Sequence, residues 1–123
     1  MTLTNNEIYI YAKNLAEAFN DKDQKLPIKI NFYLQKNKNV LIELAAAIEA
    51  ARIEIAKNYG TLNEEAQQYI IPPEKMNEVN KELVDLLTLE QEVQIYTINI
   101  DNLSDDLALT TAQMEAIMFM IEQ

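Results

Sequence analysis

The chain has 123 residues, no cysteine and no histidine, and 20 Asp and Glu against 10 Lys and Arg, for a formal net charge of -10. The length suits a single domain spanning residues 1–123, and the composition excludes disulfides, an ordinary zinc site and the commonest general base. The negative charge disfavours direct binding to nucleic acid and to an anionic membrane.

The N-terminal residues predict the end of a short strand followed by a helix. Thr4 and Glu7 have the spacing of a capping box, and Leu3 and Ile8 stand at the positions of the accompanying hydrophobic staple. Apolar residues at helical spacing continue to Phe19, so we expect the helix to end just after that residue.

Residues 27–60 predict one long central helix, around which the chain is organised. Pro27 suits the first helical position, and Gly60 is placed to end the helix with a positive φ. Such a helix spans about 50 Å, so other segments or another subunit must cover it. A strand over residues 28–34, with a break at Asn37 or Asn39, is the alternative that the period-two spacing there leaves open. The predicted apolar face consists of Ile30, Leu34, Leu41, Leu44, Ile48, Ile55 and Tyr59.

The next segment predicts a short edge strand and a third helix. Residues 69–71 are β-prone but precede Pro72 and Pro73, and proline cannot donate to a strand ladder. Pro73 is expected to start the third helix, which should pack back on the central helix in antiparallel orientation because the connection is short. Its predicted apolar face consists of Met76, Val79, Leu83, Leu86 and Leu87.

Residues 92–100 read as one strand, because they are rich in Val, Ile, Tyr and Thr. We expect Val93, Ile95 and Thr97 on one side and Tyr96, Ile98 and Ile100 on the other. A lone strand leaves backbone groups unsatisfied, so it needs a partner. The candidates are residues 1–4, residues 69–71 or the same strand of another copy.

The C-terminal residues predict a last helix that is apolar nearly all round. Thr110 and Gln113 form a second capping box, with Leu109 and Met114 at the staple positions. A terminal helix of this kind must be buried in its own domain or against a partner. We expect one face to consist of Met114, Ile117, Met118 and Ile121, with Phe119 and Met120 pointing elsewhere.

The acidic turn at residues 101–106 is a weak metal candidate. Its three carboxylates offer oxygen ligands, but the EF-hand spacing fails because Asp106 stands where glycine is needed and no Glu closes the loop. We therefore favour a solvated turn without a metal.

Three residues are candidates for contact with a ligand or partner: Arg52, Tyr59 and Tyr96. Arg52 falls on the predicted apolar stripe, where a buried guanidinium must be paired. A snorkelling side chain, or an ion pair with Glu49 or with a glutamate of the third helix, is favoured over a bound ligand such as a phosphate. The two tyrosines are more usual as core edges than as stacking platforms. Without His, no nucleophile–base pair can be assigned, and we expect neither an enzyme nor a cofactor.

The order of these features resembles a family of small tailed-phage or prophage proteins of unknown function. The segments that carry the resemblance are LPIKINFYLQKN, ARIEIAKNYG, NKELVDLL, EQEVQIYTINIDNL and LTTAQMEAIMFMIE, with a variable hairpin between the second and the third. The resemblance covers nearly the whole chain. It implies a phage origin and no known catalysis, and it assigns no functional residues.

The expected fold is α+β and mostly α: a long central helix in an antiparallel helical hairpin, covered by the N- and C-terminal helices, with a small β element. We expect a non-enzymatic phage protein that acts through protein–protein contacts, in virion assembly or as a small structural component. The alternative is an anti-defence protein, either an acidic inhibitor of a host nucleic-acid-binding protein or an oligomeric sponge for a nucleotide signal.

The expected partners are a second copy of the chain and other phage or host proteins. A two-fold dimer is the default, because the central helix, the last helix and the strand are hard to cover within so short a chain. No secretory leader or membrane-spanning run is predicted, which favours the host cytoplasm or the virion.

Overall fold

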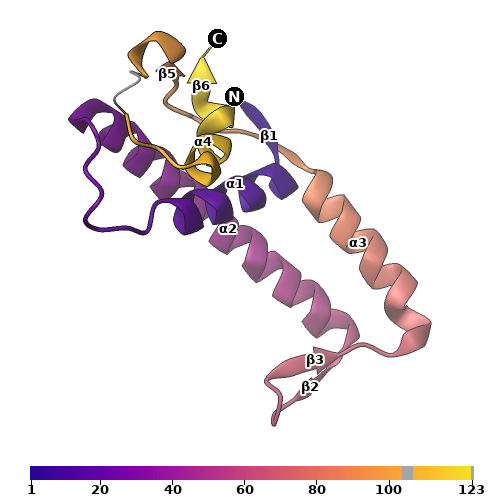
Figure 1. Ribbon diagram of the computed structural model, residues 1–123. Coiled ribbons are helices and arrows are strands. Elements are labelled where there is room, and N and C mark those ends of the chain that lie inside the picture. The colour runs from indigo at the N-terminus through magenta and orange to yellow at the C-terminus, as the bar shows by residue number, and fades with distance from the viewer. Residues whose placement is uncertain (104–106, 123) are drawn as a thin grey trace.

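The computed structural model describes residues 1–103 and 107–122, and it confirms a mostly helical α+β fold (Figure 1). The helices are α1 (Asn5–Ala18), α2 (Ile28–Tyr59), α3 (Met76–Thr88) and α4 (Thr111–Ile117). Single turns of 3-10 helix cover Pro73–Lys75, Ile100–Asn102 and Met118–Met120. The short strands are β1 (Thr2–Thr4), β2 (Thr61–Asn63), β3 (Gln68–Ile70), β4 (Glu90–Glu92), β5 (Ile98–Asn99) and β6 (Ile121–Glu122).

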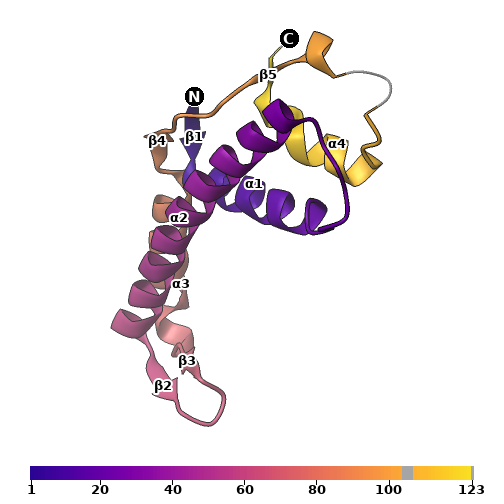
Figure 2. The ribbon, with the colours of Figure 1, turned by 90° about the vertical axis from the view of Figure 1, so that its left-hand side faces the viewer.

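The chain folds into two parts that share α2 (Figures 1 and 2). In the first, which we call the head, α1 and residues 93–103 and 107–122 pack around the N-terminal half of α2. In the second, which we call the arm (residues 43–89), α3 runs back antiparallel to α2 from the β2–β3 hairpin, as predicted. No helix in the described part of the chain is long and apolar enough to cross a membrane.

α2 is continuous, so the alternative of a strand over residues 28–34 is wrong. Asn37 does not break the helix but lies fully buried on its inner face. Gly60 ends the helix as predicted, although its φ of -118° is extended and not positive. The close approach of β3 accounts for glycine there, because a Cβ at this position would lie 2.8 Å from the carbonyl oxygen of Ile70.

Both predicted capping boxes are confirmed. The Thr4 hydroxyl accepts a hydrogen bond from the backbone of Glu7, whose side chain accepts one from the backbone of Thr4. Thr110 and Gln113 make the same reciprocal pair at the start of α4. The caps fix where α1 and α4 begin, since each satisfies N–H groups that have no partner within the helix.

The main core lies in the head, where α1 packs along α2 and α4 packs on α1. Of the predicted face of α2, Ile30, Leu34, Leu41 and Ile48 are buried, whereas Leu44, Ile55 and Tyr59 are only partly buried. Asn37 is the one polar residue among the buried residues of α2. Along α3 only Val79 is buried, and Met76 is exposed.

The prediction of one strand over residues 92–100 is wrong. β4 pairs antiparallel with β1, one of the predicted partners, and β5 pairs in parallel with β6. Between them, Asn37 pairs with the backbone of Tyr96: its Nδ2 donates to the carbonyl oxygen at 2.8 Å, and its Oδ1 accepts from the N–H at 2.8 Å. A side-chain amide thus replaces a neighbouring strand, and the predicted alternation fails because Val93 and Ile98 are both buried while Ile100 is exposed.

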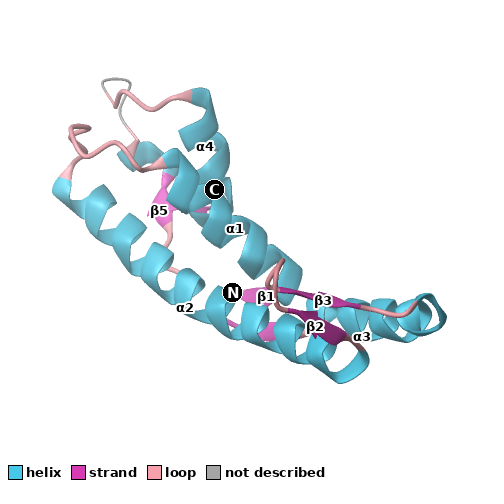
Figure 3. Ribbon diagram, turned by 90° about the horizontal axis from the view of Figure 1, so that it is seen from below, coloured by secondary structure: helices cyan, strands magenta, loops and turns pink. Residues whose placement is uncertain are grey.

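The other predicted strand is present, as the second strand of the β2–β3 hairpin. The sequence predicts a short edge strand over residues 69–71, and the structure has β3 at Gln68–Ile70, paired antiparallel with β2. Figure 3 shows this hairpin at the end of the arm, where α2 passes into α3.

The predicted facing of the last helix is wrong. α4 ends at Ile117, and the chain continues as a 3-10 turn into β6. Met120 is fully buried, whereas Met118 is 56% exposed. Phe119 stacks on Tyr11 of α1, with ring centroids 4.3 Å apart. The tighter winding after Ile117 rotates the side chains away from the positions that a continued α-helix would give them.

Candidate functional site

The outer side of α2 is exposed along its whole length (Figure 2). We call this surface the outer stripe; it consists of Ile28, Phe32, Lys36, Ile42, Glu43, Ala46, Ala50, Ile53 and Glu54. Ile28 is 86% exposed, and Phe32 and Ile53 are each 51% exposed. Ile28 and Phe32 lie one turn apart, and Ile42 and Ile53 follow at intervals of 10 and 11 residues, separated by alanines and charged residues. Apolar surface exposed along one helix is a candidate interface.

The arm buries little of its own surface. Among the described residues, Val79 is the only buried one between Ile48 and Val93. The arm is a two-helix layer that α1 contacts at its head end, where Asn5 donates to the carbonyl oxygen of Leu86 and the Tyr9 hydroxyl donates to Glu49. Further along the arm, stability depends mainly on the contact between α2 and α3.

Arg52 lies on the arm and is exposed, so its predicted place on a buried stripe is wrong. Its Nη1 atom lies 3.0 Å from Oε2 of Glu49, which confirms the expected ion pair. The same carboxylate oxygen accepts a hydrogen bond from the Tyr9 hydroxyl at 3.1 Å. Arg52 also lines a hollow of about 450 Å³ between α2, β3 and α3. These contacts give the guanidinium a structural partner.

Tyr59 is partly buried at the end of α2. Partial desolvation and the nearby carboxylates of Glu82 and Glu78 raise the pKa of its hydroxyl. The hydroxyl is therefore neutral at physiological pH and faces acidic groups of α3, a setting that disfavours an anionic ligand.

Tyr96 belongs to an aromatic cluster on the head. Its ring stacks on Tyr33 at 5.5 Å between centroids and meets Phe32 edge-on at 6.4 Å. Lys29 lies over Tyr33, and Lys36 lies over Phe32. The structure does not bring the three predicted contact residues together, because Arg52 and Tyr59 are on the arm and Tyr96 is on the head.

Basic residues are concentrated in the connection before α2 and in the first part of α2. Residues 21–38 contain five Lys against two Asp, and those lysines are half of the 10 basic residues of the chain. The arm, residues 43–89, contains nine Asp and Glu against four Lys and Arg. The charge therefore changes sign along α2, from the basic 21–38 segment at its N-terminal end to the acidic arm at its C-terminal end. This pattern can be read from the sequence, but only the continuity of α2 gives it a direction in space.

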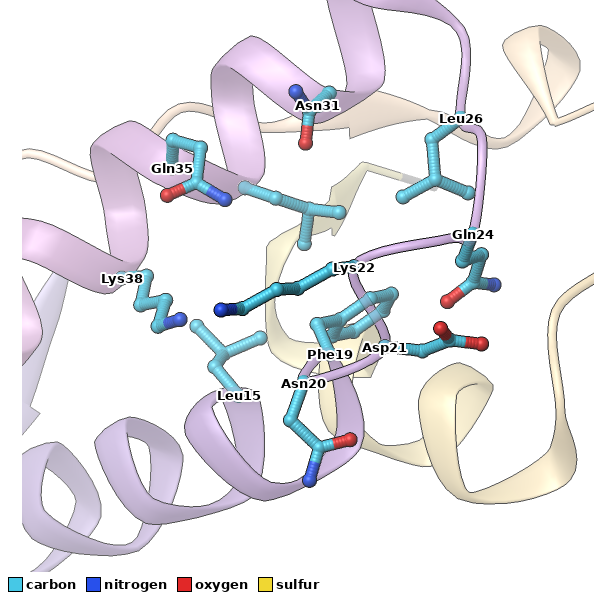
Figure 4. A pocket seen from close by; sticks show the side chains of 11 residues that line it. Leu15, Phe19, Asn20, Asp21, Lys22, Gln24, Leu26, Asn31, Gln35 and Lys38 are labelled. Carbon is cyan, nitrogen blue, oxygen red and sulfur yellow. The ribbon is translucent and has the colours of Figure 1, made fainter.

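A pocket of about 500 Å³ opens in the basic region, between the C-terminal end of α1, the 20–26 connection and the start of α2 (Figure 4). Its floor is apolar, because Leu15 and Leu34 are buried and Phe19 and Leu26 are partly buried. Lys22 reaches across this floor toward the side where Lys38 projects from α2 (Figure 4). The remaining polar lining residues are Asn20, Asp21, Gln24, Asn31 and Gln35.

A pair of side-chain amides, Gln113 buried and Gln24 partly buried, fixes the connection beside this pocket. Gln113 and Gln24 exchange two hydrogen bonds, at 2.7 and 2.9 Å, and Gln113 also donates to the carbonyl oxygen of Ala18 at the end of α1. The pocket wall is thus held by α4, which the sequence pattern alone does not reveal.

The weak metal candidate at residues 101–106 lies partly outside the described residues, because Ser104, Asp105 and Asp106 are not described. In the described part of the chain, no group of three or more His, Cys, Asp or Glu side chains is arranged to hold a metal ion.

Comparison with known proteins gives no match: no protein-family model fits the chain, and no curated protein or solved structure is significantly similar to it. The resemblance to a tailed-phage family therefore stays a prediction from the sequence segments.

Proposed function

We propose that this is a non-enzymatic phage protein that acts through protein–protein contacts, as a component or assembly factor of the virion, and that its first contact is with a second copy of itself. The observation that carries the proposal is the outer stripe of α2. Four large apolar residues of the stripe, Ile28, Phe32, Ile42 and Ile53, are exposed without a covering element in the described chain.

The charge distribution favours an antiparallel pairing of two α2 helices. Two like-charged ends would meet in a parallel pair, whereas an antiparallel pair places the basic 21–38 segment of each copy beside the acidic arm of the other. In this arrangement Lys36 of each copy faces Glu54 of the other when the two-fold axis passes near residue 45. The contact is isologous and closes as a dimer.

The middle of the stripe suits close helix packing. Ala46 and Ala50 are exposed on the same side and leave room for the backbone of a second helix. With the axis near residue 45, residues 31–59 of the two α2 helices overlap over about 44 Å at 1.5 Å per residue. The overall negative charge opposes association, and we expect the dimer to strengthen from low to moderate salt as that repulsion is screened.

Light scattering of the wild-type chain and of two variants, each with one exposed alanine replaced by glutamate, tests the proposal. Ala50→Glu puts a carboxylate into the middle of the stripe and should convert the dimer to a monomer without unfolding the chain. Ala66→Glu changes an exposed alanine of the hairpin turn in the same way and should leave the dimer intact. A monomeric wild type, or equal effects of the two variants, would overturn the proposal and favour the acidic-inhibitor alternative.

A further inference from the structure

We propose that the pocket between α1, the 20–26 connection and α2 binds a small organic phosphate of about the size of a nucleoside monophosphate. The proposal goes beyond self-association, because the pocket lining is separate from the outer stripe. Its volume of about 500 Å³ lies within the range of small-molecule sites.

Two lysines supply the charge that such a ligand needs. Lys22 and Lys38 line the same pocket from different elements, and both extend toward the same side of it (Figure 4). Lysine is a compact point charge that suits a phosphate oxygen, and a phosphate monoester carries close to two negative charges at neutral pH. A dianion therefore matches both ammonium groups, whereas a carboxylate matches only one.

The carboxylate of Asp21, which also lines the pocket, makes a hydrogen bond within the 20–26 connection. Its Oδ1 atom accepts a hydrogen bond from the backbone N–H of Asp23 at 3.0 Å, which forms the turn after α1. In Figure 4 Asp21 lies on the far side of the pocket from the amine of Lys38. The phosphate is therefore assigned to the lysine side, away from Asp21.

The rest of the pocket suits a ring system. Leu15, Phe19 and Leu34 form an apolar floor against which a flat ring can lie. Asn31 and Gln35 stand one turn apart on the same side of α2 and offer donors and acceptors to the edge of a heterocycle. An apolar floor with a few converging polar groups is the usual composition of a ligand pocket.

Isothermal titration calorimetry with four probes tests the assignment: AMP, phenyl phosphate, adenosine and inorganic phosphate. AMP and phenyl phosphate should bind, and adenosine and inorganic phosphate should bind about tenfold more weakly or not at all, because each lacks one half of the ligand. Affinity for AMP should fall as the pH drops below about 6, where the phosphate loses its second charge.

Substitutions test whether Lys22 and Lys38 are the residues that bind the phosphate. Lys22→Gln and Lys38→Gln should each weaken AMP binding about tenfold, whereas Lys25→Gln, an exposed lysine of the same connection outside the pocket, should leave it unchanged. Circular dichroism melting confirms that each variant is folded. Absence of AMP and phenyl phosphate binding at millimolar concentration, or an equal loss in Lys25→Gln, would overturn the proposal. Neither result bears on self-association through the outer stripe.

Discussion

Replacing Asn37 tests whether its side-chain amide holds the 93–97 segment on α2. Asn37→Ala removes both hydrogen bonds to the backbone of Tyr96 and leaves its N–H and C=O without their partner. A buried polar group without a partner costs about 1–3 kcal/mol, and Tyr96 is only partly buried, so we take about 1–2 kcal/mol for each group. Alanine regains about 0.6 kcal/mol of helix propensity. The expected net loss of unfolding free energy is about 2–3 kcal/mol, or roughly 6–15 °C in Tm.

Urea unfolding followed by circular dichroism measures this loss, and Asn39→Ala is the matched control. Asn39 lies two residues further along α2 and is exposed, so its replacement should be neutral or slightly stabilising. Amide hydrogen exchange should show that Asn37→Ala speeds exchange in residues 95–99 before it affects α1. Equal urea midpoints for the two variants would refute the reasoning that this amide holds the 93–97 segment on α2.

Three further predictions concern stability. Leu41→Ala should lower the unfolding free energy by about 3–5 kcal/mol in urea titrations, because Leu41 is fully buried; a loss below about 1 kcal/mol would contradict its place in the core. Gly60→Ala should lower Tm in thermal melts, since its methyl group would lie 2.8 Å from the backbone oxygen of Ile70, and an unchanged Tm would speak against that close approach. Burial and the carboxylate of Glu7 raise the pKa of Tyr11 above its value in the unfolded chain, so stability should be intact below about pH 10 and fall as the pH rises through the native pKa. Tyr11→Phe should flatten that alkaline decline in urea midpoints, and an unchanged slope would show that Tyr11 does not cause it.

Local signals predicted the helices well, and long-range contacts explain what they missed. Thr4 and Thr110 begin their helices at the predicted residues because a capping box is a contact within four residues. The strand over residues 92–100 failed because its middle bonds to Asn37, a residue 59 positions away in the sequence. A polar residue on an apolar face carries no local sign of the segment that it will bind.

The candidate site shows the same limit. Arg52 is predicted on a buried stripe because helical spacing gives a face but not its width, and beyond Ile48 the only buried residue of the arm is Val79. The ion pair with Glu49 was predictable because it spans three residues of one helix. The pocket of Lys22 and Lys38 was not, because it forms only when the turn after α1 folds against α2.

A charge-swap measurement by light scattering tests the central claim, antiparallel self-association along α2, most directly. Lys36→Glu and Glu54→Lys each place like charges opposite one another in the proposed dimer, and each variant alone should be mainly monomeric. An equimolar mixture of the two should recover the dimer mass, because every contact then joins opposite charges, and the double variant should also be dimeric. Single variants that stay dimeric, or a mixture and a double variant that stay monomeric, would contradict the account.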